Sequence, residues 1–162
     1  MTRVETLKNL QTALSMELTA THQYQLHAGV LDDWGMDRLA TKMRQEMQEE
    51  IGHSDEYLAR ILFLNGEPEL ALQKTPVVAH SLNEMFELDL ADEREAIAFY
   101  SAAAQKAAEE GDLGSRMLFE RIALDEEGHI GWLELQLSLL DRMGEPAYIA
   151  KHMSVEGEDE NH

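Results

Sequence analysis

Two short stretches decide the fold of this chain: EEIGH at residues 49–53 and DEEGH at residues 125–129. Each places a glutamate and a histidine three positions apart within a segment that otherwise has the pattern of a long helix. Because residues three apart share one helix face, each stretch presents a carboxylate and an imidazole together. Each also contains a glycine, which costs about 1 kcal/mol of helix stability relative to alanine.

The two stretches are part of an internal repeat with a shift of 76 residues. In each half, a further glutamate precedes the glutamate of the motif by 33 positions. The shift also relates Tyr24 to Tyr100. The repeat therefore joins three pairs of candidate metal ligands: Glu17 and Glu93, Glu50 and Glu126, and His53 and His129.

Composition and charge narrow the class of protein. The chain has 162 residues, few prolines and no cysteine, so we expect one all-α domain without a disulfide framework, a thiolate zinc site or an iron–sulfur cluster. Thirteen basic against thirty-two acidic residues give a net charge of −19, which repels nucleic acid and anionic lipid and attracts cations. The N-terminus has no apolar signal region, and we expect a soluble cytoplasmic protein.

Hydrophobic periodicity predicts four long helices and a short fifth. Short turns at about 32–36 and 110–113 predict two antiparallel hairpins. Residues 65–80 span at most roughly 50 Å, which is enough to run along a helix of about 42 Å, so we expect a long crossover between the hairpins. We assign residues 1–153 to one domain and residues 154–162 to an acidic, mobile tail.

The four glutamates of the repeat align with the apolar stripes of their helices, so we expect them to point into the bundle. An uncompensated buried ion costs several kcal/mol. Two divalent cations would neutralise four carboxylates, and a set of carboxylates with one imidazole per metal suits iron or manganese. The alternative is a bundle with a protonated or water-filled polar core.

The chain resembles the bacterioferritins, which are ferritin-like di-iron proteins, over essentially its whole length. The resemblance is carried by LSMELTATHQYQLHAG (14–29), RILFLNGEPEL (60–70), ELDLADE (87–93) and LDEEGHIGWLE (124–134). It implies a ferritin-like four-helix bundle with a short C-terminal helix. It also implies a role for each candidate: Glu17 and Glu93 as terminal ligands, Glu50 and Glu126 as bridges, and His53 and His129 as the ligands that each complete one iron.

The resemblance also implies the function. This would be iron storage, with ferroxidation of Fe(II) by dioxygen or peroxide at a di-iron centre and storage of ferric mineral in a hollow shell of 24 subunits. A ferredoxin is then a candidate reductant for iron release. The rivals are a small rubrerythrin-like di-iron oxidase or peroxidase without a shell, and a metal-free helical interaction module.

One residue departs from the family pattern. Bacterioferritins bind haem between two subunits through a methionine that directly follows the bridging glutamate of the second helix, and here that residue is Ile51. Isoleucine has no lone pair for iron, so we expect no stoichiometric haem in a homo-oligomer, or a mixed shell with a haem-binding sister subunit.

Other residues have less specific interpretations. The two tyrosines of the repeat either hold carboxylates or pass an electron, or they are ordinary core residues. Gly52 and Gly128 leave room for packing or for His53 to move. Glu46 and Glu49 are candidates for an acidic inner wall. The remaining histidines, which have no paired carboxylates at ligand spacing, are expected at the surface or in turns: His22, His27, His80 and His152.

Overall fold

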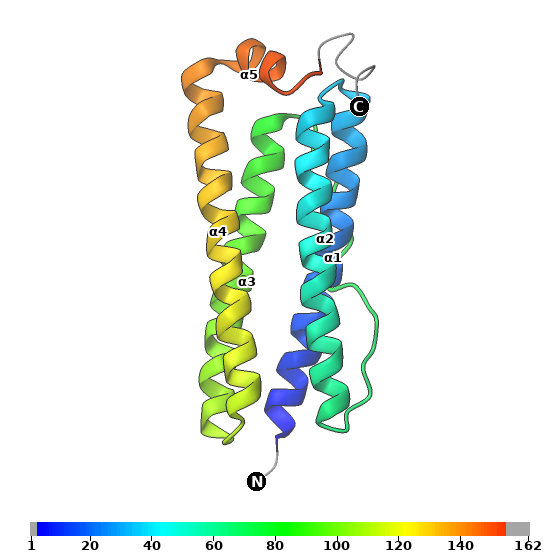
Figure 1. Cartoon of the computed structure of the whole chain (residues 1–162), viewed down its shortest axis with the longest axis vertical. Helices are drawn as coiled ribbons and strands as arrows, with labels where there is room; N and C mark the ends of the chain where they lie inside the picture. The colour runs from blue at the N-terminus through cyan, green and yellow to red at the C-terminus, as the bar shows by residue number, and fades with distance from the viewer. Residues whose placement is uncertain (1–2, 155–162) are drawn as a thin grey trace.

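A computed structural model describes residues 3–154 of the chain, and its regular elements are all helices. They are α1 (Val4–Asp33), α2 (Asp37–Phe63), α3 (Leu82–Glu109), α4 (Leu113–Met143) and α5 (Glu145–Lys151). The predicted all-α bundle with a short fifth helix is confirmed (Figure 1). The tail predicted at 154–162 lies outside the described residues except for Ser154, which hydrogen bonds to Asp37.

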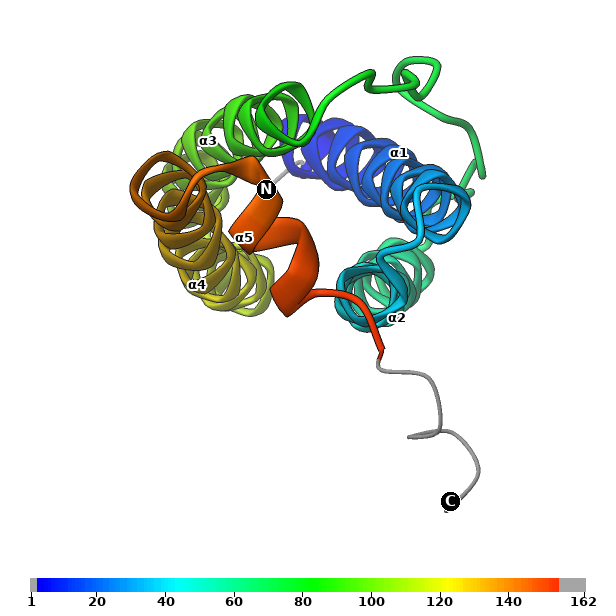
Figure 2. The same cartoon turned by 90° about the horizontal axis from the view of Figure 1, so that it is seen from above.

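The bundle consists of two hairpins, as predicted. Helix α1 packs mainly on α2 and helix α3 mainly on α4, and Figure 2 shows the four long helices arranged in a ring with α5 across one end. Each hairpin turn contains a glycine in the left-handed region, Gly35 with φ 85° and Gly111 with φ 74°. Only glycine adopts this conformation without steric cost, so these two residues allow the reversals.

Side-chain caps define where α3 and α4 begin. Ser81 accepts a hydrogen bond from the backbone N–H of Glu84, and Asp112 accepts one from that of Ser115, each at 3.1 Å. These bonds satisfy N–H groups that have no partner within the helix. Asp112 also accepts a bond of 2.6 Å from Arg60 on α2, so the same residue links the two hairpins.

The crossover between α2 and α3 is pinned along α1 by polar side chains. The Gln11 amide exchanges two hydrogen bonds with the backbone of Glu69, at 2.6 and 2.9 Å. The Gln23 amide does the same with Val77, at 2.9 Å in both directions. The two side-chain amides thus satisfy backbone N–H and C=O groups of the crossover, which has no neighbouring strand within residues 3–154 to bond with. The long crossover is therefore an ordered strap on the hairpin of α1 and α2.

Two apolar clusters fill the bundle, one toward each end. Along each long helix, the candidate ligands fall between residues of the two clusters. A polar layer thus divides the core, and α5 closes one apolar end with the buried ring of Tyr148. Among residues 3–154, no helix combines the length and apolar character that crossing a bilayer requires.

Candidate metal centre

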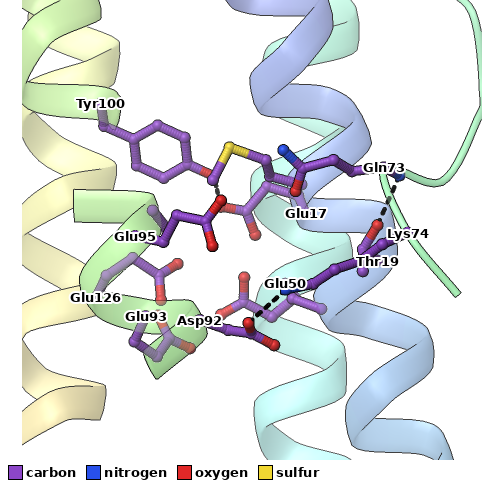
Figure 3. Close-up of a pocket in the computed structure, with 13 residues that line it drawn as sticks. Glu17, Thr19, Glu50, Gln73, Lys74, Asp92, Glu93, Glu95, Tyr100 and Glu126 are labelled. Atoms are coloured by element: carbon purple, nitrogen blue, oxygen red, sulfur yellow. Dashed lines mark hydrogen bonds and ion pairs between the residues drawn. The ribbon is translucent and has the colours of Figure 1, made fainter. Parts of the chain in front are cut away.

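The six candidate ligands converge from four helices at the middle of the bundle. Their ligand atoms form two groups, and within each group these atoms lie within 4.8 Å of one another. The first group is Glu17, Glu50, His53 and Glu126, and the second is Glu50, Glu93, Glu126 and His129. Two carboxylates, Glu50 and Glu126, belong to both groups, while each terminal glutamate and each histidine belongs to one. Figure 3 shows the four glutamates pointing toward a common centre.

The site is buried, and several of its polar atoms lack partners. All six side chains are between 1% and 6% exposed. No hydrogen-bond partner in residues 3–154 reaches Glu17 Oε2, Glu50 Oε1, His53 Nδ1 or either oxygen of Glu126. Unpartnered acceptors at this depth are costly, and a cation is the partner that would satisfy carboxylate and imidazole lone pairs together. The donor set therefore fits two divalent metal ions.

The pKa shifts of the six candidate ligands also indicate that the site favours bound positive charge. Burial, followed by repulsion from neighbouring carboxylates, raises the pKa of Glu50 and of Glu93. Burial disfavours the charged imidazoles of His53 and His129, but the glutamate carboxylates that lie close to both rings outweigh it and raise both pKa values. Burial likewise opposes ionisation of Glu126, yet the close approach of Glu93 and of the two histidines lowers its pKa. Without metal ions, bound protons therefore offset the negative charge of the four carboxylates, and metal ions would replace these protons on binding.

The two tyrosines of the repeat hold the two terminal glutamates across the bundle. Tyr24 on α1 donates to Glu93 Oε1 on α3 at 2.8 Å, and Tyr100 on α3 donates to Glu17 Oε1 on α1 at 2.6 Å. Each phenol is buried and fixes one carboxylate oxygen, which leaves the other oxygen for a ligand. The interpretation of these tyrosines as residues that hold carboxylates is supported by the geometry, and electron transfer through them stays a prediction.

The outward nitrogens of the histidines contact acids that the ligand pattern does not include. His53 Nε2 donates to Asp125 Oδ2 at 3.0 Å, and His129 Nε2 donates to Glu49 Oε2 at 2.8 Å. Sequence reasoning missed Asp125 in this role, although the shift of 76 relates it to Glu49. Glu46 lies with its Oε2 2.7 Å from His129 Nε2 and is 5% exposed, so its expected place on an inner wall was wrong.

A second buried histidine–carboxylate pair corrects another expectation. His27 is fully buried, and its Nε2 lies 2.8 Å from Asp89 Oδ1. It was expected at the surface because no acid stands at helical spacing from it, but its partner lies 62 positions further along the chain. His22 and His80 are exposed, as expected, and His152 is half-buried.

Comparison with known proteins decides the family. A family model described as "Ferritin-like domain" matches residues 7–143. The bacterioferritin of Rhodobacter capsulatus is 44% identical over 135 residues, which cover 83% of this chain and 84% of that protein. The chain belongs to the bacterioferritin family.

Solved bacterioferritin structures agree with this assignment. The R. capsulatus structure matches with a TM-score of 0.93 at 38% identity, over 97% of this chain and 98% of that chain. It is described as having a metal-free dinuclear site and a haem iron in a crystallographic special position. The bacterioferritin of Mycobacterium tuberculosis matches with a TM-score of 0.89 at 38% identity, over 92% and 94% of the two chains. Since these relatives are bacterioferritins, the rubrerythrin-like alternative is not favoured.

The two glycines of the motifs are not needed for packing within this bacterioferritin chain. A Cβ atom added at Gly52 or Gly128 would have no atom of residues 3–154 within 4 Å, beyond its chain neighbours and its own helix backbone. Both positions are exposed. The packing explanation for Gly52 and Gly128 is therefore wrong within this subunit, and freedom of His53 to move stays a prediction.

Proposed function

We propose that this chain oxidises Fe(II) at a two-iron centre inside each subunit and stores the ferric product within a shell of 24 copies. The observation that carries the proposal is the pair of overlapping ligand groups, which share Glu50 and Glu126. Two shared carboxylates support two adjacent cation positions, as in other two-metal sites with spacings of roughly 3.5–4 Å. The alternative of a metal-free interaction module gives no reason for a buried cluster of unpartnered acceptors.

In this proposal, Fe(II) is the substrate and the protein supplies the ligands. Two Fe(II) ions each give up one electron, and dioxygen takes two electrons and two protons to form hydrogen peroxide, or peroxide is reduced to water. Glu17 and His53 would hold one ion, and Glu93 and His129 the other. Four carboxylates match the charge of two Fe(II) ions, and oxygen-rich ligands also suit the Fe(III) that forms. The paired ions avoid the release of one-electron products.

A small cavity gives the carboxylates a connection toward the α1 and α3 side of the bundle (Figure 3). It has a volume of about 40 Å³ and reaches all four glutamates of the site. Gln73 and Lys74 of the crossover line it, together with Asp92 of α3, and Lys74 Nζ lies 2.6 Å from Asp92 Oδ1. The volume suits water or dioxygen, since one water needs about 10–15 Å³ measured in this way.

Exposed apolar side chains support assembly into a shell. Large hydrophobic residues lie exposed near the turns of the bundle, and Phe63 and Leu113 are 69% and 63% exposed. Groups of this kind mark surfaces that another chain covers. The net charge of −19 would attract Fe(II) to the assembled protein. These features support the 24-subunit assembly that family membership suggests, with a ferredoxin as a candidate reductant for release.

We also propose that a shell made only of this chain holds no stoichiometric haem. Ile51 stands on α2 directly after the shared Glu50 and is only half-buried within the subunit. An isoleucine there cannot ligate haem iron from either side of a symmetric subunit pair. A Soret band of near-stoichiometric intensity in the purified protein would contradict this proposal.

The test of the proposed function is aerobic Fe(II) titration of the purified protein together with its native mass. We expect a mass near 24 subunits and a fast ferric absorbance increase up to two Fe(II) per subunit. The increase should be abolished in Glu50→Ala. The matched control Glu127→Ala removes an exposed acid from α4 outside both ligand groups and should oxidise iron normally. A monomer, or a Glu50→Ala variant that oxidises Fe(II) at the parent rate, would contradict the proposal.

A further inference from the structure

The internal repeat is broken at one buried polar pair outside the ligand groups. His27 on α1 and Asp89 on α3 are 0% and 3% exposed, and they lie 2.8 Å apart. The shift of 76 relates His27 to Ala103 and Asp89 to Ala13. Both alanines are buried in one apolar cluster. The two halves of the bundle therefore share their ligand types, but one half has a histidine–aspartate pair where the other has two methyl groups.

The hydrogen bonds around His27 give this pair a net negative charge. Gln23 Oε1 accepts a bond from the N–H of Val77, so the amide nitrogen of Gln23 is the atom that faces His27 Nδ1, at 3.4 Å. A donor at that place requires a lone pair on Nδ1, so the ring is neutral and donates its Nε2 proton to Asp89. A neutral ring does not cancel the charge of an ionised carboxylate. Burial raises the pKa of Asp89, while the bond from His27 favours its ionised form, as a nearby divalent cation also would.

The pair lies beside one of the two proposed metal positions. Asp89 precedes the terminal ligand Glu93 by four residues, so the two buried carboxylates share one face of α3. The ring of His27 meets that of Tyr24 edge-on, with 6.5 Å between centroids, and Tyr24 donates to Glu93. Burial, followed by the charges of Glu93 and Asp89, raises the pKa of Tyr24. The charge of Asp89 therefore acts on the position that Glu93 and His129 would serve.

The other acids near Asp89 each have a cationic partner. Glu46 on α2 and Asp92 on α3 both act on Asp89 by charge repulsion. Glu46 lies 2.8 Å from Lys42, and Asp92 lies 2.6 Å from Lys74, so an ammonium offsets each of these acids. Within residues 3–154, the ion-pair partner of Asp89 is the neutral imidazole rather than a lysine or an arginine. Asp89 is thus the uncompensated charge on this side of the site.

We propose that the His27–Asp89 pair makes the two metal positions unequal, so that the position served by Glu93 binds a divalent cation more tightly than the position served by Glu17. This inference rests on the proposed two-metal function. A buried negative charge attracts a divalent ion strongly because the protein interior screens charge less than water does. Beside the position served by Glu17, the two alanines of the repeat supply no such charge. Iron loading therefore has an order, with the Glu93 position filled first.

The test is Co(II) binding to the assembled full-length protein, measured by calorimetry. Two bound cations repel each other, so even equal positions would fill in two phases, and each position is therefore measured alone. Glu17→Gln leaves the Glu93 position, and Glu93→Gln leaves the Glu17 position. We expect the first variant to bind its Co(II) about tenfold or more tightly than the second. Asp89→Asn keeps an acceptor oxygen for His27 but removes the charge, so it should weaken Co(II) binding by about tenfold in the Glu17→Gln background and by less than about twofold in the Glu93→Gln background.

The controls separate charge from packing and the inference from the proposed function. Glu87→Gln removes an exposed acid of α3 and should leave both affinities unchanged. Combining His27→Ala with Asp89→Ala gives the alanine pair of the other half, and it should bring the two affinities together.

Four outcomes would overturn the inference. Equal or reversed affinities in Glu17→Gln and Glu93→Gln, or no effect of Asp89→Asn, would do so while the two-metal site stands. Equal weakening of both positions by Asp89→Asn would show a purely structural pair. If the parent binds no Co(II), the proposed function fails and the inference fails with it.

Discussion

Replacing Glu50 with glutamine should affect the metal-free and the metal-loaded protein very differently. Ligand atoms of Glu50 lie within 4.8 Å of those of Glu17 and Glu126. At an effective dielectric constant of about 20, two unit charges at this distance repel by about 3.5 kcal/mol. Burial, followed by this repulsion, raises the pKa of Glu50 and so favours its protonated form, which glutamine resembles. The free energy of unfolding of the metal-free protein should therefore change by less than about 1 kcal/mol.

The metal-loaded protein should respond strongly to the same substitution. At 100 times the dissociation constant, each bound Co(II) adds about 2.7 kcal/mol, and two add about 5 kcal/mol. At roughly 2–4 °C per kcal/mol, this corresponds to an increase of about 10–20 °C in the melting temperature of the parent. Glu50→Gln should lose most of this increase, because Glu50 belongs to both ligand groups. Glu17→Gln should keep about half, because Glu17 belongs to one.

The assay is differential scanning calorimetry of the parent and both variants, at equal protein concentration, with and without Co(II). The reasoning would be refuted if Glu50→Gln lowered the metal-free melting temperature by 10 °C or more, since the carboxylate would then stabilise the protein without metal. Equal loss of the Co(II) effect in Glu17→Gln and Glu50→Gln would refute the distinction between terminal and shared ligands.

Three further predictions follow from individual contacts. Tyr100→Phe removes the donor of one terminal carboxylate, and since hydrogen bonds to charged groups contribute about 1.5–3 kcal/mol, Co(II) titration should show affinity at one site reduced by about tenfold or more. Burial would raise the pKa of Asp112, but hydrogen bonds from Ser115 and Arg60 lower it below its usual value. The ionised Asp112 therefore stabilises the folded protein at pH values above the unfolded pKa of about 3.9, and this contribution is lost as pH falls through the lowered pKa. Acid titration of the unfolding free energy should accordingly show a shallower decline below about pH 4 in Asp112→Asn. Ile51→Met should introduce a haem ligand, so the variant incubated with haem should gain a Soret band that the parent lacks, and equal bands in both would contradict the role assigned to Ile51.

The fold and the six candidate ligands could be predicted from sequence because they depend on spacing along single helices. Helical periodicity placed the glutamates on the apolar stripes, and the repeat paired them between hairpins. Short turns and a crossover of adequate length then restricted the topology. The caps at Ser81 and Asp112 are equally local, because each side chain accepts a hydrogen bond from the residue three positions further along.

Contacts between helices could not be predicted in the same way. The bonds from Tyr24 to Glu93 and from His53 to Asp125 depend on how far each hairpin is rotated about its axis, and no periodicity within one helix encodes that rotation. The buried partner of His27 was missed for the same reason. The internal shift of 76 held usable information about Asp125, since it is the repeat equivalent of Glu49.

The most direct test of the account is a crystal structure of the protein soaked with Fe(II), with anomalous diffraction measured at the iron absorption edge. The account predicts two iron peaks per subunit, roughly 3.5–4 Å apart, each in contact with both Glu50 and Glu126. One peak should also contact Glu17 and His53, and the other Glu93 and His129. Iron found only at surface acids, with no peak between Glu50 and Glu126, would contradict it.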